Sequence, residues 1–199
     1  MSDTNQSSRA GVDETLAALW SPILALTTVN EGRFNGMIAT TGIVASLVPE
    51  APRVAVELWK FTYTRELVLA SGVLALHVLA GAPSDALERT LLLVRQLGIH
   101  SGRDRDKLAD IAWKAGVTGA PILQDALSCV EGRVVHTIDL EECTFVVAEV
   151  VHAHRLRSGS PLPRAVLRQH VPQEWLGEWD ASRERQIADA RSRRCRAPV

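Results

Sequence analysis

LTTVNEGRFNGMIATT, residues 26–41, is the stretch that sets the fold, because it holds two extended segments and the turn that joins them. Pro22 to Val29 is rich in apolar and β-branched residues, and Phe34 to Ala39 resumes an extended pattern. Between them, residues 30–33 have the composition of a turn. The stretch therefore predicts a β-hairpin, followed at Thr40 to Ser46 by a small, hydroxyl-rich segment.

The rest of the chain adds strands and helices in an order that favours antiparallel pairing. A third strand is predicted over Arg53 to Lys60, where apolar residues alternate with polar or small ones. The other predicted elements are a short helix from Tyr63 to Ser71, a strand from Val73 to Leu79, helices from Ser84 to Gly98 and from Asp104 to Ala115, and long strands from Ala126 to His136 and from Cys143 to Ala153. Long strands that are apolar on both faces are typical of a barrel wall. The order predicts a mostly β fold with added helices, of the α+β class.

Composition and charge argue against several kinds of partner. The chain has 199 residues, of which 46% are apolar, and 22 basic side chains stand against 23 acidic ones, for a net charge of −1. This balance provides no basic field for nucleic acid or an anionic membrane, and no apolar run reaches the roughly 20 residues that span a bilayer. Cys129, Cys143 and Cys195 form no CxxC motif and are odd in number. We therefore expect a cytoplasmic protein.

The two ends of the chain differ from its middle. Residues 1–12 are polar and small, and they predict a disordered tail without an export signal. Residues 13–157 are interpreted as one domain, and residues 158–199 as a linker and a C-terminal helical extension. The linker is Ser158 to Pro163, and the segment from Arg183 to Arg196 is dense in Arg and Ala with a helical rhythm. This extension is interpreted as a dimer arm, with a disordered tail as the alternative.

Several short motifs follow one another between Leu19 and Leu156. They are Asn35-Gly36-Met37-Ile38-Ala39-Thr40-Thr41, Ala45-Ser46-Leu47 with Pro49 and Pro52, Leu58-Trp59-Lys60-Phe61-Thr62-Tyr63-Thr64, Ser71-Gly72 before a strand, His100-Ser101-Gly102-Arg103-Asp104-Arg105-Asp106-Lys107-Leu108, and Phe145-Val146-Val147-Ala148-Glu149-Val150. Their order resembles the flavin reductase-like family of FMN-binding split β-barrels. The resemblance implies a split β-barrel that binds FMN without covalent attachment, with FAD as the alternative. It also implies a homodimer whose cofactor pocket lies at the subunit boundary.

The residue types in these motifs suit a flavin. Small residues let the main chain approach the edge of the isoalloxazine ring, and the phosphate needs hydroxyl groups, N–H groups and a cation. No GxGxxG or GxxxxGK[ST] loop is present, so scattered groups must hold the nucleotide. The cofactor-binding candidates are Met37, Ile38, Ala39, Thr40, Thr41, Ser46, Lys60, Thr62, Thr64, Ser101 and Arg103. Read singly, such residues also fit turns, helix caps and solvated strand ends.

One family motif is missing. Relatives that reduce flavin with a nicotinamide often carry Gly-Asp-His ahead of the last strand, and here those positions are Glu141, Glu142 and Cys143. The imidazole is absent, and two carboxylates stand beside the expected path of an anionic dinucleotide. The resemblance still implies an FMN-binding oxidoreductase, an NAD(P)H-dependent flavin reductase with NADH or NADPH as co-substrate. The alternatives are a flavin-binding electron-carrier module without its own nicotinamide site, and a barrel that has lost flavin for another ligand.

Three other chemistries find little support. His152 and His154 project from one strand face, and two ligands at this spacing do not complete a zinc shell, so no metal is predicted. A cysteine within a strand, such as Cys143, usually serves as a small apolar filler. The chain shows no Ser-His-Asp arrangement in a supporting context. We therefore expect no catalytic side chain, because the flavin itself carries the chemistry.

Overall fold

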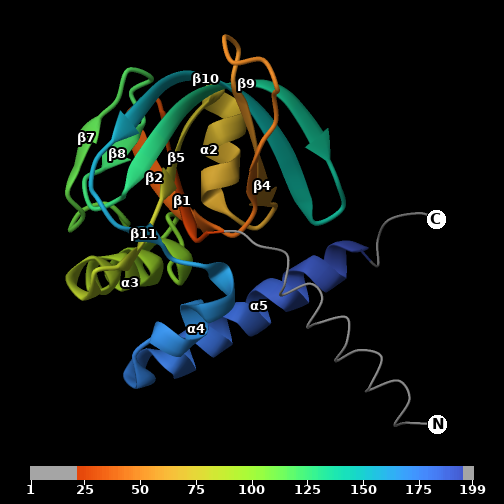
Figure 1. Ribbon diagram of the computed structural model, residues 1–199. Coiled ribbons are helices and arrows are strands. Elements are labelled where there is room, and N and C mark those ends of the chain that lie inside the picture. Colours follow the sequence, from red (N-terminus) through yellow and green to blue (C-terminus); the bar gives the residue numbers. More distant parts are fainter. Residues whose placement is uncertain (1–21, 195–199) are drawn as a thin grey trace, which may run out of the picture.

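The computed structural model describes residues 22–194. Its centre is a seven-stranded antiparallel sheet with the strand order β2-β1-β5-β9-β10-β4-β3 (Figure 1). The strands are β1 (Leu24–Asn30), β2 (Arg33–Ala39), β3 (Gly42–Val44), β4 (Arg53–Trp59), β5 (Val73–Val78), β9 (Ser128–Asp139) and β10 (Cys143–Arg155). The tail predicted at residues 1–12, and Cys195, lie outside the described residues.

The β1–β2 hairpin confirms the prediction from residues 26–41. Asn30 pairs with Arg33 across a two-residue turn, in which Glu31 and Gly32 have φ angles of 49° and 75°. Positive φ at both central residues is the type I′ geometry, whose twist matches that of the flanking strands. Gly32 adopts this conformation without the steric cost that a side chain adds.

The sheet curls until its two edges meet. β2 and β3 are the edge strands, yet only Thr40 and Thr41 separate the end of β2 from the start of β3. A Cβ built on Gly42 of β3 would lie 2.5 Å from Cδ1 of Leu24 on β1, so the far edge reaches the first strands. This contact closes the sheet into a barrel and confirms the mostly β fold with added helices.

Alternate residues of the strands fill the barrel, as the period of two requires. This core consists of Leu24, Leu26, Met37, Ala39, Val56, Leu58, Leu74, Leu76, Val146 and Ala148. Helix α2 (Tyr63–Ser71) lies in the opening of the curled sheet and adds Val68 to the same core (Figure 1). It ends at Gly72, whose φ of 69° gives the left-handed cap that favours glycine.

A second core lies outside the barrel wall. Helix α3 (Ser84–Gly98) packs Leu93 and Leu97 into it, and the C-terminal helices α4 (Leu167–His170) and α5 (Leu176–Arg194) add Leu167 and Trp179. The remaining elements are the strand pairs β6 (Ala80–Ala82) with β11 (Ser160–Pro161) and β7 (Trp113–Ala115) with β8 (Pro121–Leu123), and 3-10 turns at Arg164–Val166 and Gln173–Trp175. None of the helices within residues 22–194 is long and apolar enough to cross a membrane.

The prediction of a helix over Asp104 to Ala115 is wrong. Residues 99–112 form turns and bends, and the end of the segment belongs to β7. Oδ1 of Asp106 accepts a hydrogen bond from the main-chain N–H of Leu108 at 2.8 Å, a local bond that competes with helical pairing. Lys107 is buried against the end of α3, with its ammonium on main-chain carbonyls. The helical spacing of apolar residues here reflects packing of an irregular loop.

Candidate functional site

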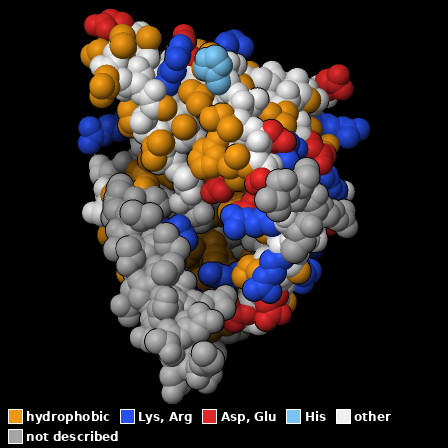
Figure 2. Space-filling model, turned by 90° about the vertical axis from the view of Figure 1, so that its right-hand side faces the viewer, with side chains coloured by type: hydrophobic (Ala, Val, Ile, Leu, Met, Phe, Trp, Pro, Cys, Tyr) orange, Lys and Arg blue, Asp and Glu red, His pale blue; other side chains and the backbone are white. Residues whose placement is uncertain are grey.

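A cavity of about 720 Å³ opens between one end of the barrel and helix α5. Its walls come from the end of β2, the link between β4 and α2, the end of α3 with the loop after it, and one side of α5. Figure 2 shows a hollow below the barrel, with hydrophobic side chains inside it and Lys or Arg side chains at its rim. The size falls within the roughly 300–1,000 Å³ that small-molecule sites occupy.

The link between β4 and α2 is held by Thr62. Its Oγ1 donates a hydrogen bond to the carbonyl of Trp59 at 2.8 Å and accepts one from the N–H of Arg65 at 3.4 Å, which caps the first turn of α2. The rings of Trp59 and Phe61 stack with their centroids 6.3 Å apart. This turn therefore presents aromatic rings and threonine side chains to one cavity wall.

Lys107 anchors the loop that follows α3. Its Nζ donates hydrogen bonds to the carbonyl oxygens of Leu97 at 2.8 Å and His100 at 3.2 Å, and the residue is only 6% exposed. These carbonyls would otherwise lack partners at the helix end. Burial lowers the pKa of Lys107 to about 8. The sequence reading missed this residue, because a charge run gives no sign that one of its members is buried.

Asn35 lies beneath the same loop. The residue is buried, and neither polar atom of its amide has a hydrogen-bond partner among the described residues. A Cβ built on Gly102, which lines the cavity, would overlap this amide. An unpaired buried amide costs about 1–3 kcal/mol. Glycine at position 102 therefore lets the loop lie directly on Asn35.

The structure brings together six of the eleven cofactor-binding candidates. The candidates that line the cavity are Met37, Ile38, Thr40, Thr62, Thr64 and Ser101. Ala39 faces the barrel core, Thr41 is half-buried outside the cavity lining, and the hydroxyl of Ser46 accepts a hydrogen bond from the N–H of Val48 at 3.1 Å. Met37, Ile38 and Thr40 thus share one cavity with Thr62 and Thr64, which lie more than twenty residues later in the chain.

Lys60 and Arg103 are not among the residues that line the cavity, and both make ion pairs. Nζ of Lys60 donates to Oδ2 of Asp139 at 2.7 Å, and Lys60 does not line the cavity. Arg103 binds the carboxylate of Glu66 and lines a separate surface pocket. Its guanidinium also lies over the ring of Tyr63, 5.1 Å from the ring centroid.

Helix α5 forms a wall of the cavity that the sequence reading did not anticipate. Trp179, Ser182 and Gln186 are among its lining residues. Arg194 near its end pairs with Glu142, Nη2 to Oε1 at 2.8 Å, which partly neutralises the acidic pair at 141–142. The neighbouring Cys143 is buried, and burial and then Glu57 raise its pKa to about 12, so this thiol is not ionised at neutral pH.

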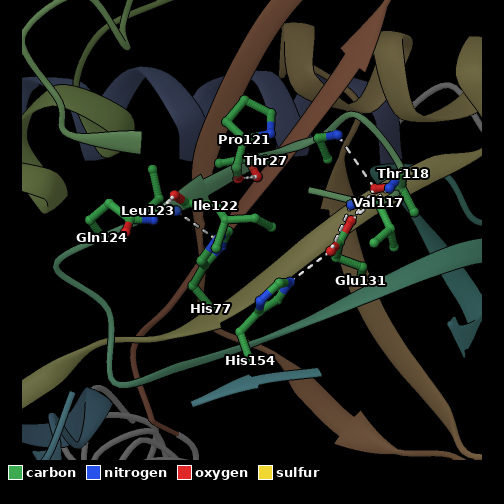
Figure 3. A network of polar contacts seen from close by, with 11 residues as sticks. Thr27, His77, Val117, Thr118, Pro121, Ile122, Leu123, Gln124, Glu131 and His154 are labelled. Atoms are coloured by element: carbon green, nitrogen blue, oxygen red, sulfur yellow. Dashed lines mark hydrogen bonds and ion pairs between the residues drawn. The ribbon is translucent and has the colours of Figure 1, made fainter. Parts of the chain in front are cut away.

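A second polar network lies away from the cavity, on the outer side of the sheet (Figure 3). The carboxylate of Glu131 on β9 is fully buried and accepts hydrogen bonds from the N–H groups of Val117 and Thr118, the Thr118 hydroxyl and the ring of His154. His77 on β5 is also fully buried, and its Nε2 accepts a hydrogen bond from the N–H of Leu123 at 3.1 Å. Both groups fix the segment around β7 and β8 to the sheet.

Known proteins share both the sequence pattern and the fold of this chain. The family model described as "Flavin reductase like domain" matches residues 16–171. A high molecular weight rubredoxin of Moorella thermoacetica is 32% identical over 148 residues, which cover 73% of this chain but only 61% of that protein. FMN reductase (NADH) RutF of Stutzerimonas stutzeri is 26% identical over 151 residues, 75% of this chain and 80% of that protein. A solved structure, nitrilotriacetate monooxygenase component B from Mycobacterium thermoresistibile, shares the fold with a TM-score of 0.65 at 22% identity, over 80% of this chain and 83% of that one.

Proposed function

The chain belongs to the flavin reductase-like family, and from that premise we propose that it is an FMN-dependent oxidoreductase, an NAD(P)H-dependent flavin reductase. The observation that carries the proposal is the cavity, which collects Met37, Ile38 and Thr40 from β2 and its end with Thr62 and Thr64 from the start of α2. A related protein is named FMN reductase (NADH), which supports FMN as cofactor and a reduced nicotinamide as co-substrate.

The residues present fit a flavin mononucleotide. Gly98 and Gly102 are among the lining residues, where a Cβ would press on Ile38 and Asn35, and the link before α2 contributes aromatic rings and hydroxyl groups. The buried, unpaired amide of Asn35 lies directly under Gly102. Apolar walls with a few polar groups and a nearby cation are the composition that binds a flat, partly charged ligand.

The bound flavin supplies hydride and electron transfer, and the chain supplies binding and electrostatics. Trp59, Phe61 and Trp179 contribute aromatic rings to the cavity lining. Lys107, whose ammonium is fixed by two carbonyl oxygens, is a lining residue, and its positive charge near the cavity favours negative charge on a ligand there. No side chain is assigned as a catalytic acid.

An electron-carrier module without its own nicotinamide site is the second candidate function. The substitution of Glu141, Glu142 and Cys143 for the Gly-Asp-His of the family pattern favours it. Against it, Arg194 pairs with Glu142 and reduces the repulsion that an anionic dinucleotide would meet. The buried thiol of Cys143 does not replace an imidazole, because its raised pKa keeps it protonated.

Absorbance and turnover measurements separate these candidates. The visible spectrum of the purified protein, followed by titration with FMN, reports flavin binding. Saturating oxidation of NADH or NADPH by the FMN-loaded protein supports the reductase, and bound FMN without turnover supports the carrier. A colourless protein that also fails to take up added FMN would contradict both, and would favour a barrel that binds another ligand.

We also propose that the protein is a homodimer. Large apolar side chains are exposed on β3, on the loop after it and near the far end of β9, and they include Ile43, Leu47 and Ile138 at 61%, 102% and 57% exposure. Figure 2 shows hydrophobic side chains gathered on the upper part of one face. Patches of this kind mark protein interfaces. Sedimentation should give a dimer for the wild type and a folded monomer for Ile43→Glu, and an unchanged dimer in the variant would remove this face from the interface.

We propose a cytoplasmic location because two cysteines are free thiols. Cys129 and Cys143 are both buried and free in the described part of the chain. Free buried thiols are typical of a reducing compartment. Fractionation of cells that produce the protein, with an antibody against it, tests the location directly.

A further inference from the structure

Helix α5 lies across the proposed cofactor cavity and is fixed near both of its ends. Near its start, Glu178 pairs with Arg95 of α3 at 3.3 Å and lies 3.9 Å from the ring of His100. Near its end, Arg194 pairs with Glu142 between β9 and β10. Figure 1 shows α5 passing below the open end of the barrel. The helix lies beyond residues 16–171, the segment that the family model matches, so this wall belongs to the extension of this chain.

One stripe of α5 faces the cavity. It includes Trp179, Ser182, Arg183, Gln186 and Ala190, which recur at spacings of three and four residues along the helix. Residues at such spacings share one helix face. Arg185, Ile187 and Asp189 also line the cavity, on either side of this stripe. Ser182, in the middle of the stripe, is only 6% exposed.

Arg183 is a cation in this stripe, and its charge acts electrostatically on Asp180 of the same helix. Within residues 22–194 its guanidinium makes no hydrogen bond and no ion pair, although Asp180 lies on the same helix and pairs with Arg168 at 2.9 Å. The two lysines considered above are engaged: Lys107 holds two carbonyl oxygens, and Lys60 pairs with Asp139. A guanidinium with free N–H groups is the side chain best shaped to bind the oxygens of a phosphate.

We propose that Arg183 binds the phosphate of the flavin mononucleotide, so that the C-terminal extension completes the cofactor site. This inference rests on the proposed function, since it needs a flavin in the cavity. Arg105, Arg164 and Arg185 also line the cavity, and like that of Arg183 their guanidinium groups make no hydrogen bond or ion pair within residues 22–194. Arg183 is preferred because it lies four residues from Trp179 on the same face of α5. Arg185 lies about 120° around the helix from Trp179, Arg105 is shared with the neighbouring surface pocket, and Arg164 lies before α4 in a 3-10 turn. Arg183 thus takes the phosphate-binding role for which the sequence had suggested Lys60.

The test compares FMN with riboflavin, which has the same ring and no phosphate. Dissociation constants for both are measured by quenching of flavin fluorescence on the full chain, for wild type, Arg183→Ala, Arg183→Lys and Arg191→Ala. Arg191 is the matched control, because it is an exposed arginine on the same helix that does not line the cavity. We expect Arg183→Ala to weaken FMN roughly 10- to 100-fold, as for loss of a hydrogen bond to a charged group, with riboflavin changed less than about twofold.

The other variants show whether charge or hydrogen-bond geometry at position 183 matters. Arg183→Lys should weaken FMN less than Arg183→Ala, because it keeps the charge and loses the fork of N–H groups. Arg191→Ala should bind both flavins as the wild type does. Equal weakening of FMN and riboflavin in Arg183→Ala, or no weakening of either, overturns the assignment, and selective loss in Lys60→Ala instead would return the phosphate to Lys60. A wild-type protein that binds neither flavin refutes the proposed function itself, which is a different result from a binding protein whose Arg183 variants behave as wild type.

Discussion

Replacement of Glu131 by Gln should remove about 3 kcal/mol of stability at neutral pH. The buried carboxylate accepts four hydrogen bonds, among them 2.8 Å from the N–H of Thr118 and 2.7 Å from the ring of His154. Burial would raise the pKa of Glu131, but the hydrogen bonds of His154 and Thr118 outweigh it and lower the pKa from 4.5 to about 2. A lowering of this size corresponds to about 3 kcal/mol. The amide of Gln offers one acceptor oxygen and turns two N–H donors toward groups that are themselves donors.

The pH dependence has a defined sign. Because the pKa of Glu131 is lower in the folded state than in the unfolded chain, its contribution is present above about pH 4.5 and is lost as the pH falls toward 2. Urea unfolding followed by tryptophan fluorescence should therefore show a gap between wild type and Glu131→Gln that is full at pH 7 and narrows below pH 4.5.

An exposed carboxylate provides the control. Glu149 on β10 pairs with Arg53 at 3.7 Å, and its side chain is 47% exposed. Glu149→Gln should change the free energy of unfolding by less than about 1 kcal/mol, as is usual for surface pairs. Two results would contradict this prediction. One is a free energy of unfolding of Glu131→Gln within about 1 kcal/mol of the wild-type value at pH 7, and the other is a difference between the two free energies that does not change with pH.

Three further predictions concern the core and the cavity. Burial lowers the pKa of His77 to about 4, so the wild type should lose stability as the pH falls from 6.5 toward 4. His77→Gln keeps a donor and an acceptor but does not titrate, so its free energy of unfolding, measured in urea at pH 7, 5.5 and 4.5, should lack this pH-dependent loss. Gly102→Ala should weaken FMN binding roughly tenfold in a fluorescence titration, because the new methyl group overlaps the amide of Asn35 and displaces the loop. Unchanged affinity would show that the loop accommodates the methyl group without moving. Thr62→Ala should destabilise the protein by about 1 kcal/mol through loss of the N-cap of α2, seen as a lower urea midpoint, whereas Thr62→Ser should unfold close to wild type.

Local signals predicted the strands and placed the segment 37–40 in the candidate site. The β1–β2 hairpin follows from alternating apolar residues and turn chemistry within 16 residues, and both act over short distances. The motif at 37–40 lies at the cavity because it ends β2, next to the closure of the barrel. These features need no knowledge of distant partners.

The parts that the sequence did not predict depend on distant contacts. Nζ of Lys60 meets Asp139, which is 79 residues away, so no local pattern reveals that this cation is engaged. Lys107 is buried by the end of α3, which a charge run conceals. The position of α5 is set by the pairs of Glu178 with Arg95 and of Arg194 with Glu142, and a helical rhythm rich in arginine does not specify either.

The strand order has a consequence for how the nascent chain acquires its structure. Among the described strands, the β3–β4 hairpin forms its ladder with the rest of the sheet through β10, where Val56 pairs with Val146, so this pairing must wait for most of the polypeptide to leave the ribosome. Closing so large a loop is costly, and folding times on the order of milliseconds to seconds are typical of topologies dominated by such distant pairings. Until β10 arrives, the main-chain groups of β4 that pair with it have no strand partner, and such an unpaired strand edge is prone to aggregation during synthesis.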